Sequence, residues 1–184
     1  MPRRSMHPAA PNKMPAAVPI QATAAPQLAY IGIGANLGDA LENVEAAFTA
    51  LGALQTTRLV ARSSLFRTAP VDADGGDYIN AVACIETMLT PVALLEALLA
   101  IEQAQGRTRS YRNAPRPLDL DILLYGTLQL QSATLTIPHP RLTERAFVLV
   151  PLLQIAPMID IPGMGAANVF APAVAGQAIC QVTV

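Results

Sequence analysis

The chain has 184 residues, a formal net charge of -1 and a hydrophobic fraction of 52%. This length predicts a single domain with a substantial core, and the near-neutral charge argues against a general nucleic-acid binder. The most apolar segment is interrupted by Pro151, Gln154 and Pro157, so no membrane span is expected. Cys84 and Cys180 form no CxxC pair and no apolar signal segment begins the chain, which predicts a reducing, cytoplasmic location.

The basic residues and histidines exclude several kinds of site. Lys13 is the only lysine among the twelve basic residues, so the body of the chain offers no P-loop, protein-kinase or Schiff-base lysine. His139 is the only histidine in the body, because His7 lies near the N-terminus. A zinc site built from histidine and cysteine is therefore not expected.

The chain divides into three segments by composition. Residues 1–27 contain six prolines and no acidic residue, which predicts a disordered tail. A transit peptide is the alternative, although the prolines oppose the amphipathic helix that it needs. Residues 28–160 are predicted to form the folded domain, and residues 161–184 form a C-terminal extension of ambiguous structure.

Strand and helix patterns alternate in the folded domain. A strand from Leu28 ends in a glycine-rich turn, and Asp39 is predicted to cap a helix that stops at Gly52. Residues 56–68 are predicted as one long strand, and a second strand begins at Tyr78.

The second half of the domain continues this alternation. Thr90 is predicted to cap a helix that runs to Gly106, and a strand carrying Asp119 follows. A further helix begins at Thr143 and is expected to break or kink near Pro151. The order βαββαβα predicts the α+β class, as a ferredoxin-like α/β sandwich with a mainly antiparallel sheet and helices packed on it.

The sequence GIGANLG, residues 32–38, is similar to a dinucleotide-binding fingerprint. Gly38 comes one position late for GxGxxG, and no βαβ unit with an acidic ribose ligand follows. A tight turn before the capped helix is the better interpretation.

The segment RPLDLDILLYG, residues 116–126, places two acidic residues in a run otherwise fit for a buried strand. Strand side chains alternate between faces, so Asp119 and Asp121 point the same way, roughly 7 Å apart. Their repulsion, about 2 kcal/mol at an effective dielectric constant of about 20, favours a cation between them. The arginine-rich segment GRTRSYRNAPR just before them suits a polyphosphate with its magnesium.

Three other residues are candidates for a binding site. Tyr78 and Asn80 share a strand face and would suit a flat heterocycle through stacking and hydrogen bonds, although plain sheet surface is the commoner explanation. His139 is compatible with a role in the site and equally with an ordinary position in a loop.

Several ordered segments resemble one known family. They extend from Tyr30 to about Pro157 and read YIGIGANLGD, SSLFRTAPV, DYINAV, RNAPRPLDLDILLYG and IPHPRLTERAFVLVPL. This set closely resembles the 6-hydroxymethyl-7,8-dihydropterin pyrophosphokinase family of folate biosynthesis. The resemblance implies a ferredoxin-like fold, two Mg²⁺ ions, and transfer of the β,γ-diphosphate of ATP to the hydroxymethyl group of a dihydropterin, with AMP released. A monomer is expected.

The resemblance also implies roles for individual residues. Asp119 and Asp121 would bind magnesium and act in catalysis with Arg107 and Arg116. The pterin site would be formed by Thr68, Val71, Tyr78, Asn80 and Phe147, and the ATP site by Glu102, Arg107, Arg109, Arg112, Arg116, His139 and Arg145. The arginine loop is one residue shorter than in some members, which leaves open how Arg107 and Arg109 divide their roles. No general base is implied.

Two other functions are compatible with these residues. One is a different Mg²⁺-dependent phosphoryl or nucleotidyl transferase, which would not need the pocket of Tyr78, Asn80 and Phe147. The other is a binding module without catalytic activity, which leaves the repulsion between the two aspartates unexplained.

Overall fold

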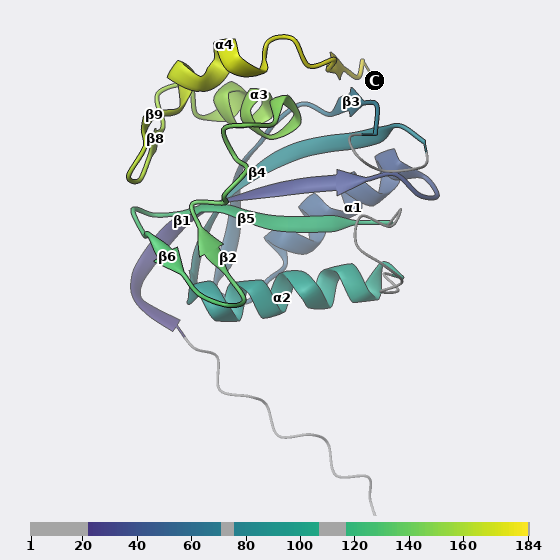
Figure 1. Cartoon of the computed structure of the whole chain (residues 1–184). Helices are drawn as coiled ribbons and strands as arrows, with labels where there is room; N and C mark the ends of the chain where they lie inside the picture. The colour runs from purple at the N-terminus through teal and green to yellow at the C-terminus, as the bar shows by residue number, and fades with distance from the viewer. Residues whose placement is uncertain (1–21, 71–75, 107–116, 184) are drawn as a thin grey trace, which may run out of the picture.

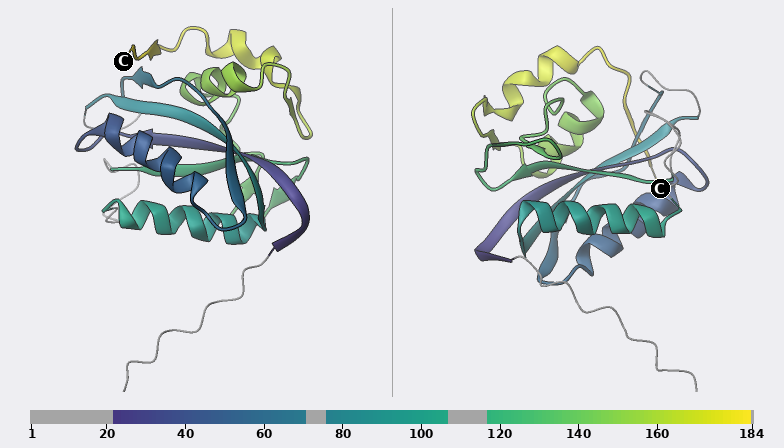
Figure 2. Two further views of the ribbon diagram at one scale, coloured as in Figure 1. Left: turned by 180° about the vertical axis from the view of Figure 1, so that it is seen from behind. Right: turned by 60° about the horizontal axis from the view of Figure 1, so that its bottom comes forward.

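The computed structural model describes residues 22–70, 76–106 and 117–183. A six-stranded sheet forms the middle layer. Helices α1 (Ala40–Gly52) and α2 (Pro91–Ala104) cover one face of this sheet. Helix α3 (Ala146–Ile155) and the C-terminal segment cover the other face (Figure 1, Figure 2).

All strand pairs of the central sheet are antiparallel, which confirms the predicted α+β class. The order is β10-β3-β4-β1-β5, and β2 also pairs with β4. The six strands are β1 (Ala22–Ala35), β2 (Thr57–Arg62), β3 (Phe66–Thr68), β4 (Tyr78–Leu89), β5 (Asp119–Tyr125) and β10 (Cys180–Gln181). Two small hairpins accompany it: β6 (Leu130–Gln131) with β7 (Thr136–Ile137), and β8 (Asp160–Ile161) with β9 (Gly165–Ala166).

The first two helices begin as their capping residues predict. The Asp39 carboxylate accepts a hydrogen bond from the Glu42 amide at 3.0 Å, and the Thr90 hydroxyl accepts one from the Ala93 amide at 3.3 Å. Both helices bury an apolar stripe in a core that also contains the odd-numbered residues of β1 from Ala29 to Ala35. This core includes the fully buried residues Ile31, Val44, Leu51, Leu94 and Leu98.

The second core lies on the opposite face of the sheet. Val82 and Leu123 of the sheet pack with Leu149 and Leu152 of α3 in this cluster. The sequence predicted a break or a kink near Pro151, and a break is wrong, because α3 continues through this residue to Ile155. Proline removes one helical hydrogen bond, but Pro151 is itself buried, and burial of this face supports the helix across the missing bond.

The segment after α3 packs onto the same body. It forms the β8–β9 hairpin, a 3₁₀ helix η1 (Ala167–Phe170), the short helix α4 (Ala171–Val174) and the edge strand β10. Ala167 and Val174 are buried in the second core, which fixes the segment over α3. In the described parts of the chain, no helix is long and apolar enough to cross a membrane.

Two strand boundaries differ from the sequence-based prediction. β1 begins at Ala22, inside the segment predicted as a tail, because it continues to pair with β4 as far as Ala22 and Leu89. The long strand predicted for residues 56–68 is two strands, separated at Ser63. The Ser63 backbone amide donates to the Val82 carbonyl, and its hydroxyl accepts from the Val82 amide at 2.9 Å. These bonds satisfy the local backbone while the chain changes direction.

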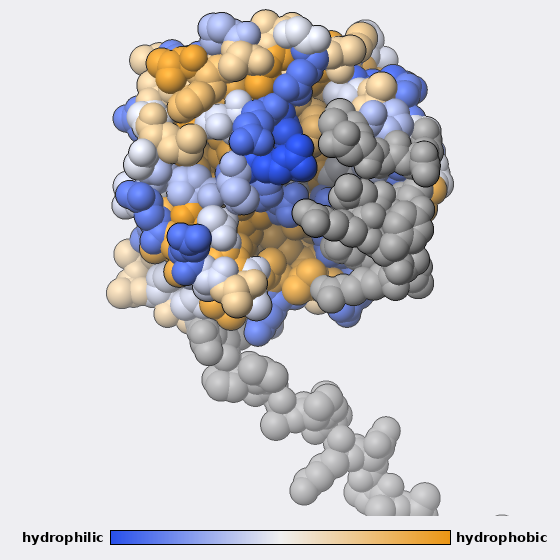
Figure 3. All heavy atoms as spheres, in the orientation of Figure 1, coloured by the Kyte–Doolittle hydropathy of each residue, from blue (hydrophilic) through white to orange (hydrophobic). Residues whose placement is uncertain are grey.

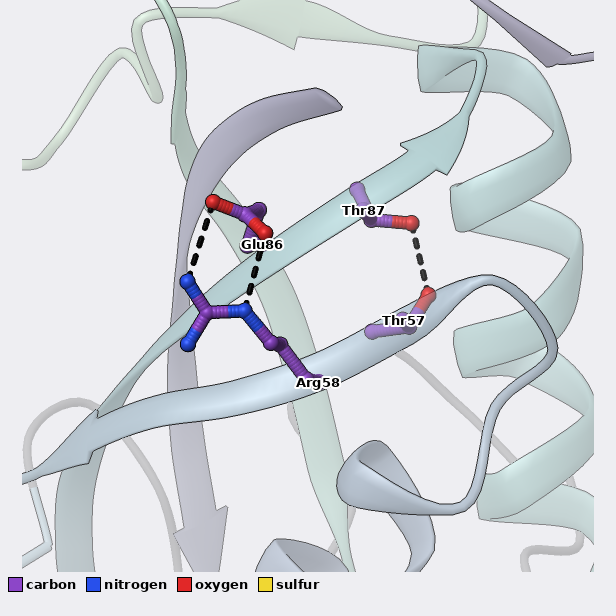
Figure 4. Close-up of polar contacts among 4 residues, drawn as sticks. All are labelled: Thr57, Arg58, Glu86 and Thr87. Carbon is purple, nitrogen blue, oxygen red and sulfur yellow. Dashed lines mark hydrogen bonds and ion pairs between the residues drawn. The ribbon is translucent and has the colours of Figure 1, made fainter. Parts of the chain in front are cut away.

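Polar pairs at the first two residues of β2 reinforce its pairing with β4. The Arg58 guanidinium binds the Glu86 carboxylate through two hydrogen bonds of 2.8 and 3.1 Å. The hydroxyls of Thr57 and Thr87 lie 2.6 Å apart beside them (Figure 4). The ion pair is solvent-exposed, so its contribution to stability is small.

Candidate active site

A pocket lies between the sheet and the start of α3. It brings together eight of the residues predicted from the sequence: Thr68, Tyr78, Asn80, Asp119, Asp121, His139, Arg145 and Phe147. Strongly hydrophilic residues also gather on the face shown in Figure 1, in the upper middle of the space-filling view (Figure 3). Val71, Arg107, Arg109, Arg112 and Arg116 lie outside the described residues.

The floor of the pocket is a row of residues in register across three strands. Gly34 of β1 pairs with Asn80 of β4 on one side and with Asp119 of β5 on the other. Neighbouring strands are about 4.8 Å apart, so the backbone positions of Asn80 and Asp119 are separated by about 10 Å. Gly34 places no side chain between them, and the floor is therefore open from the amide to the carboxylate.

The glycines of GIGANLG thus have two different roles. Gly32 and Gly34 lie inside β1 and line the pocket, so the interpretation of the whole motif as a turn is wrong for them. Gly38 is the turn residue, with a φ of 64° that side chains disfavour. A β-carbon at Gly34 would lie 3.4 Å from the Asn80 side-chain oxygen, on the pocket side.

Asp119 and Asp121 are partly exposed residues of β5 that both line the pocket. Leu120 and Ile122, which alternate with them, are buried in the core below. Glu102 of α2 is not a lining residue. It is almost fully buried, and its carboxylate accepts a hydrogen bond from the Leu120 amide at 2.8 Å. Glu102 therefore holds the strand between the two aspartates against α2.

Asn80 has a fixed side-chain orientation. It is buried, and its Nδ2 donates to the Thr68 hydroxyl at 2.9 Å. Tyr78, two residues earlier on the same strand, also lines the pocket. A flat ring, an oriented amide and a hydroxyl therefore meet at the β4 side of the floor.

The other wall comes from the first residues of α3. Arg145 precedes the helix, and its guanidinium carbon lies 5.3 Å from the centre of the Phe147 ring. Burial lowers the pKa of Arg145, with a further contribution from Arg141, whereas the carboxylates of Asp121 and Asp119 raise it. Arginine nonetheless stays charged near neutral pH. A cation and an aromatic face are thus presented to the pocket together.

His139 is held neutral in this wall. Burial, and after it the positive charges of Arg145 and Arg141, lower the pKa of His139 from 6.5 to about 4. Its Nδ1 accepts a hydrogen bond from the Arg141 amide at 3.1 Å. A neutral imidazole that accepts at Nδ1 carries its proton on Nε2, so His139 is a neutral hydrogen-bond donor.

The sequence-based prediction missed Arg141 and the two glycines among the lining residues. Arg141 lines the pocket beside His139 and could have been found from its place two residues after the histidine. Gly32 and Gly34 have no functional side chain. The only signal for them in the sequence was their spacing of two residues, which places both on the same face of a strand.

Comparison with known proteins assigns the chain to a family. Residues 30–157 match the family model of 7,8-dihydro-6-hydroxymethylpterin-pyrophosphokinase. Proteins named 2-amino-4-hydroxy-6-hydroxymethyldihydropteridine pyrophosphokinase are similar over most of their length. The Haemophilus influenzae protein is 47% identical over 135 residues, 73% of this chain and 84% of that protein. The Pseudomonas aeruginosa protein is 45% identical over 137 residues, 74% of this chain and 85% of that protein.

Solved structures show the same fold. One chain of Plasmodium falciparum HPPK-DHPS aligns with a TM-score of 0.65 at 13% identity, over 80% of this chain. This chain spans 44% of that longer protein. The agreement of the family match, the close relatives and the fold leads to one assignment. The chain belongs to the 7,8-dihydro-6-hydroxymethylpterin-pyrophosphokinase family.

Proposed function

We propose that this protein is a pyrophosphokinase of folate biosynthesis that transfers the β,γ-diphosphate of ATP to 6-hydroxymethyl-7,8-dihydropterin in a Mg²⁺-dependent reaction. The observation that carries the proposal is the row Asn80, Gly34, Asp119 across three strands. It joins a site for a heterocycle to a site for phosphate and metal across an open glycine floor. The family membership and the names of the relatives support the same reaction.

The acceptor would bind at the β4 side of the floor. A pterin has a flat ring system with an edge of amide-like donors and acceptors, which suits the oriented amide of Asn80. The rings of Tyr78 and Phe147 would stack on its faces. The hydroxymethyl arm would then extend over Gly34 toward Asp119.

The nucleotide phosphates would bind at the β5 side. Arg145 supplies a fixed positive charge and His139 a neutral donor at Nε2, and both line the pocket with the aspartates. We assign Arg107, Arg109, Arg112 and Arg116 to the triphosphate as well, from the resemblance alone. Glu102 would act by supporting β5.

The donor set around the aspartates fits Mg²⁺. This ion prefers oxygen ligands and is commonly held by one or two carboxylates plus substrate phosphates. Within residues 22–70, 76–106 and 117–183, no group of three or more His, Cys, Asp or Glu residues could hold a metal by itself. Asp119 and Asp121 would therefore hold Mg²⁺ together with phosphate oxygens. When bound, two ions would neutralise phosphate charge.

The residues would bring the reacting atoms into line. The pterin hydroxyl oxygen forms a bond to the β-phosphorus, and the bond from that phosphorus to the oxygen bridging it to the α-phosphorus breaks, releasing AMP. Arg145 would stabilise the negative charge of the transferring group. The hydroxyl proton leaves to water or to a phosphate oxygen, because no side chain is assigned as its base.

We further propose that the protein acts as a monomer, because one pocket gathers residues expected for both the pterin and ATP. A cytoplasmic location agrees with Cys84 and Cys180, which are both free thiols.

Calorimetric titration with ATP, with and without Mg²⁺ and the pterin, tests this function. The proposal predicts pterin binding, Mg²⁺-dependent ATP binding, and turnover when all three are present. Binding of both ligands without any turnover would favour the binding-module alternative. ATP binding without pterin binding would favour a different transferase.

A further inference from the structure

Gln177 joins the C-terminal segment to the start of α3. Its Oε1 accepts a hydrogen bond from the Ala146 amide at 2.8 Å, and its Nε2 donates to the Glu144 carbonyl at 2.8 Å. These two bonds hold the backbone on both sides of Arg145. The N-cap residue Arg145 provides no side-chain cap for α3. Gln177 therefore supplies from 31 residues away the cap that most helices receive locally.

Gln177 is itself fixed in place on both sides. The backbone amide of Gln177 donates a hydrogen bond to the carbonyl of Val174, and Val174 is 2% exposed in the second core. Beyond Gln177 the chain forms β10 and pairs with β3, and the Val182 amide donates to the Leu65 carbonyl at 2.8 Å. Gln177 thus transmits the position of an anchored segment to α3.

The residues held by Gln177 form one wall of the pocket. Arg145 lies between the two clamped backbone groups, and Phe147 follows one residue after Ala146. The same C-terminal segment pairs with β3, whose last residue, Thr68, lines the opposite side of the pocket. This segment lies beyond residue 157, where the family match ends.

We infer that Gln177 is a positioning residue for the proposed reaction. By fixing the backbone around Arg145, it sets where the guanidinium and the Phe147 ring meet the substrates. Gln177 is largely solvent-exposed, so its hydrogen bonds contribute little to the stability of the whole fold. Small displacements of substrate-binding groups, in contrast, strongly reduce substrate affinity and the turnover rate. The inference rests on the proposed function, because it concerns the same pocket.

Replacement of the side chain tests this role. Gln177→Ala removes both bonds. Gln177→Glu keeps an acceptor for the Ala146 amide but loses the donor to Glu144, and its negative charge suits a helix N-terminus. Gln181→Ala is the matched control, because Gln181 is an exposed glutamine of the same segment. The measurements are the Kd of the pterin by calorimetry, kcat and KM, the Tm, and hydrogen exchange of a peptide containing Ala146.

Gln177→Ala is expected to weaken pterin binding by about three- to tenfold, lower kcat, and speed exchange at Ala146, with Tm within about 4 °C of the parent. Gln177→Glu should recover part of the affinity, and Gln181→Ala should match the parent. Parent-like affinity and kcat in Gln177→Ala would overturn the inference, and so would a larger fall in Tm, which would make Gln177 a stability residue. If the parent protein binds no pterin, either alone or with Mg²⁺ and a non-hydrolysable ATP analogue, the proposed function itself has failed.

Discussion

Phe147→Ala separates a substrate-binding role of this ring from a packing role. Phe147 is half-buried, lies under the Arg145 guanidinium and lines the pocket. Full burial of an aromatic side chain removes roughly 150–250 Å² of its surface from water. A pterin would cover one face of the ring, which we take as about 60 Å² of that surface. At about 25 cal/mol per Å² this burial gives roughly 1.5 kcal/mol, and stacking adds about 0.5–1.5 kcal/mol.

The predicted loss of pterin affinity is therefore about 2–3 kcal/mol, or roughly 30- to 160-fold in Kd. Calorimetry with the pterin, without and with Mg²⁺ and a non-hydrolysable ATP analogue, measures this loss directly. The free energy of unfolding should fall by less than the roughly 3–5 kcal/mol typical of a fully buried phenylalanine, because Phe147 is only half-buried.

Phe48 provides a matched control elsewhere in the fold. It is 2% exposed in the first core, and the Arg62 guanidinium carbon lies 5.5 Å from its ring centre. Phe48→Leu should reduce stability and leave the pterin Kd unchanged. If Phe147→Ala instead loses several kcal/mol of stability and binds the pterin with parent affinity, the stacking role is refuted.

The remaining predictions concern the metal ligands, the floor and the histidine. Asp119→Asn and Asp121→Asn should each abolish turnover in a product assay while the Tm without Mg²⁺ holds or rises, because each change relieves like-charge repulsion; near-normal turnover at low Mg²⁺ would contradict the metal site. Gly34→Ala should fold normally, since its β-carbon would lie 3.4 Å from the Asn80 oxygen, but weaken pterin binding in calorimetry by narrowing the floor. Because the folded-state pKa of His139 is lowered to about 4 from 6.5, its neutral form stabilises the fold fully above pH 6.5, and this contribution is lost as the pH falls toward 4. Denaturant unfolding measures the free energy of unfolding of the parent and of His139→Gln, and the difference between them should change by at most about 3 kcal/mol across this pH window. A difference in unfolding free energy that does not depend on pH would contradict the buried, neutral histidine.

The elements that could be predicted from the sequence depend on local interactions. Asp39 and Thr90 each accept a hydrogen bond from a residue three positions later, so their helices were recognisable from short patterns. The alternation around Asp119 and Asp121 likewise needs only one strand.

The elements that were mispredicted depend on distant partners. The break at Ser63 is stabilised by Val82, and the continuation of α3 through Pro151 depends on burial against the sheet. The extension of β1 to Ala22 depends on the length of β4. None of these partners is visible in the local pattern.

The same distinction applies to the site. Residues with distinctive chemistry, such as Asp119, Asn80 and His139, were predicted, and the structure places them around one pocket. Gly34 and Gln177 could not be predicted. Gly34 acts by lacking a side chain, at a position set by the register of three strands. The Gln177 side chain acts through hydrogen bonds to the backbone of a segment 31 residues away.

Phosphorus NMR of a reaction containing the protein, ATP, Mg²⁺ and 6-hydroxymethyl-7,8-dihydropterin tests the central claim most directly. An ordinary kinase transfers the γ-phosphoryl group and releases ADP, commonly with a lysine on the phosphates, whereas Lys13 is the only lysine in this chain. Attack at the β-phosphorus predicts AMP and a pterin diphosphate in equal amounts, without ADP or free orthophosphate. ADP as the nucleotide product, or no nucleotide turnover at all, would contradict the proposed function.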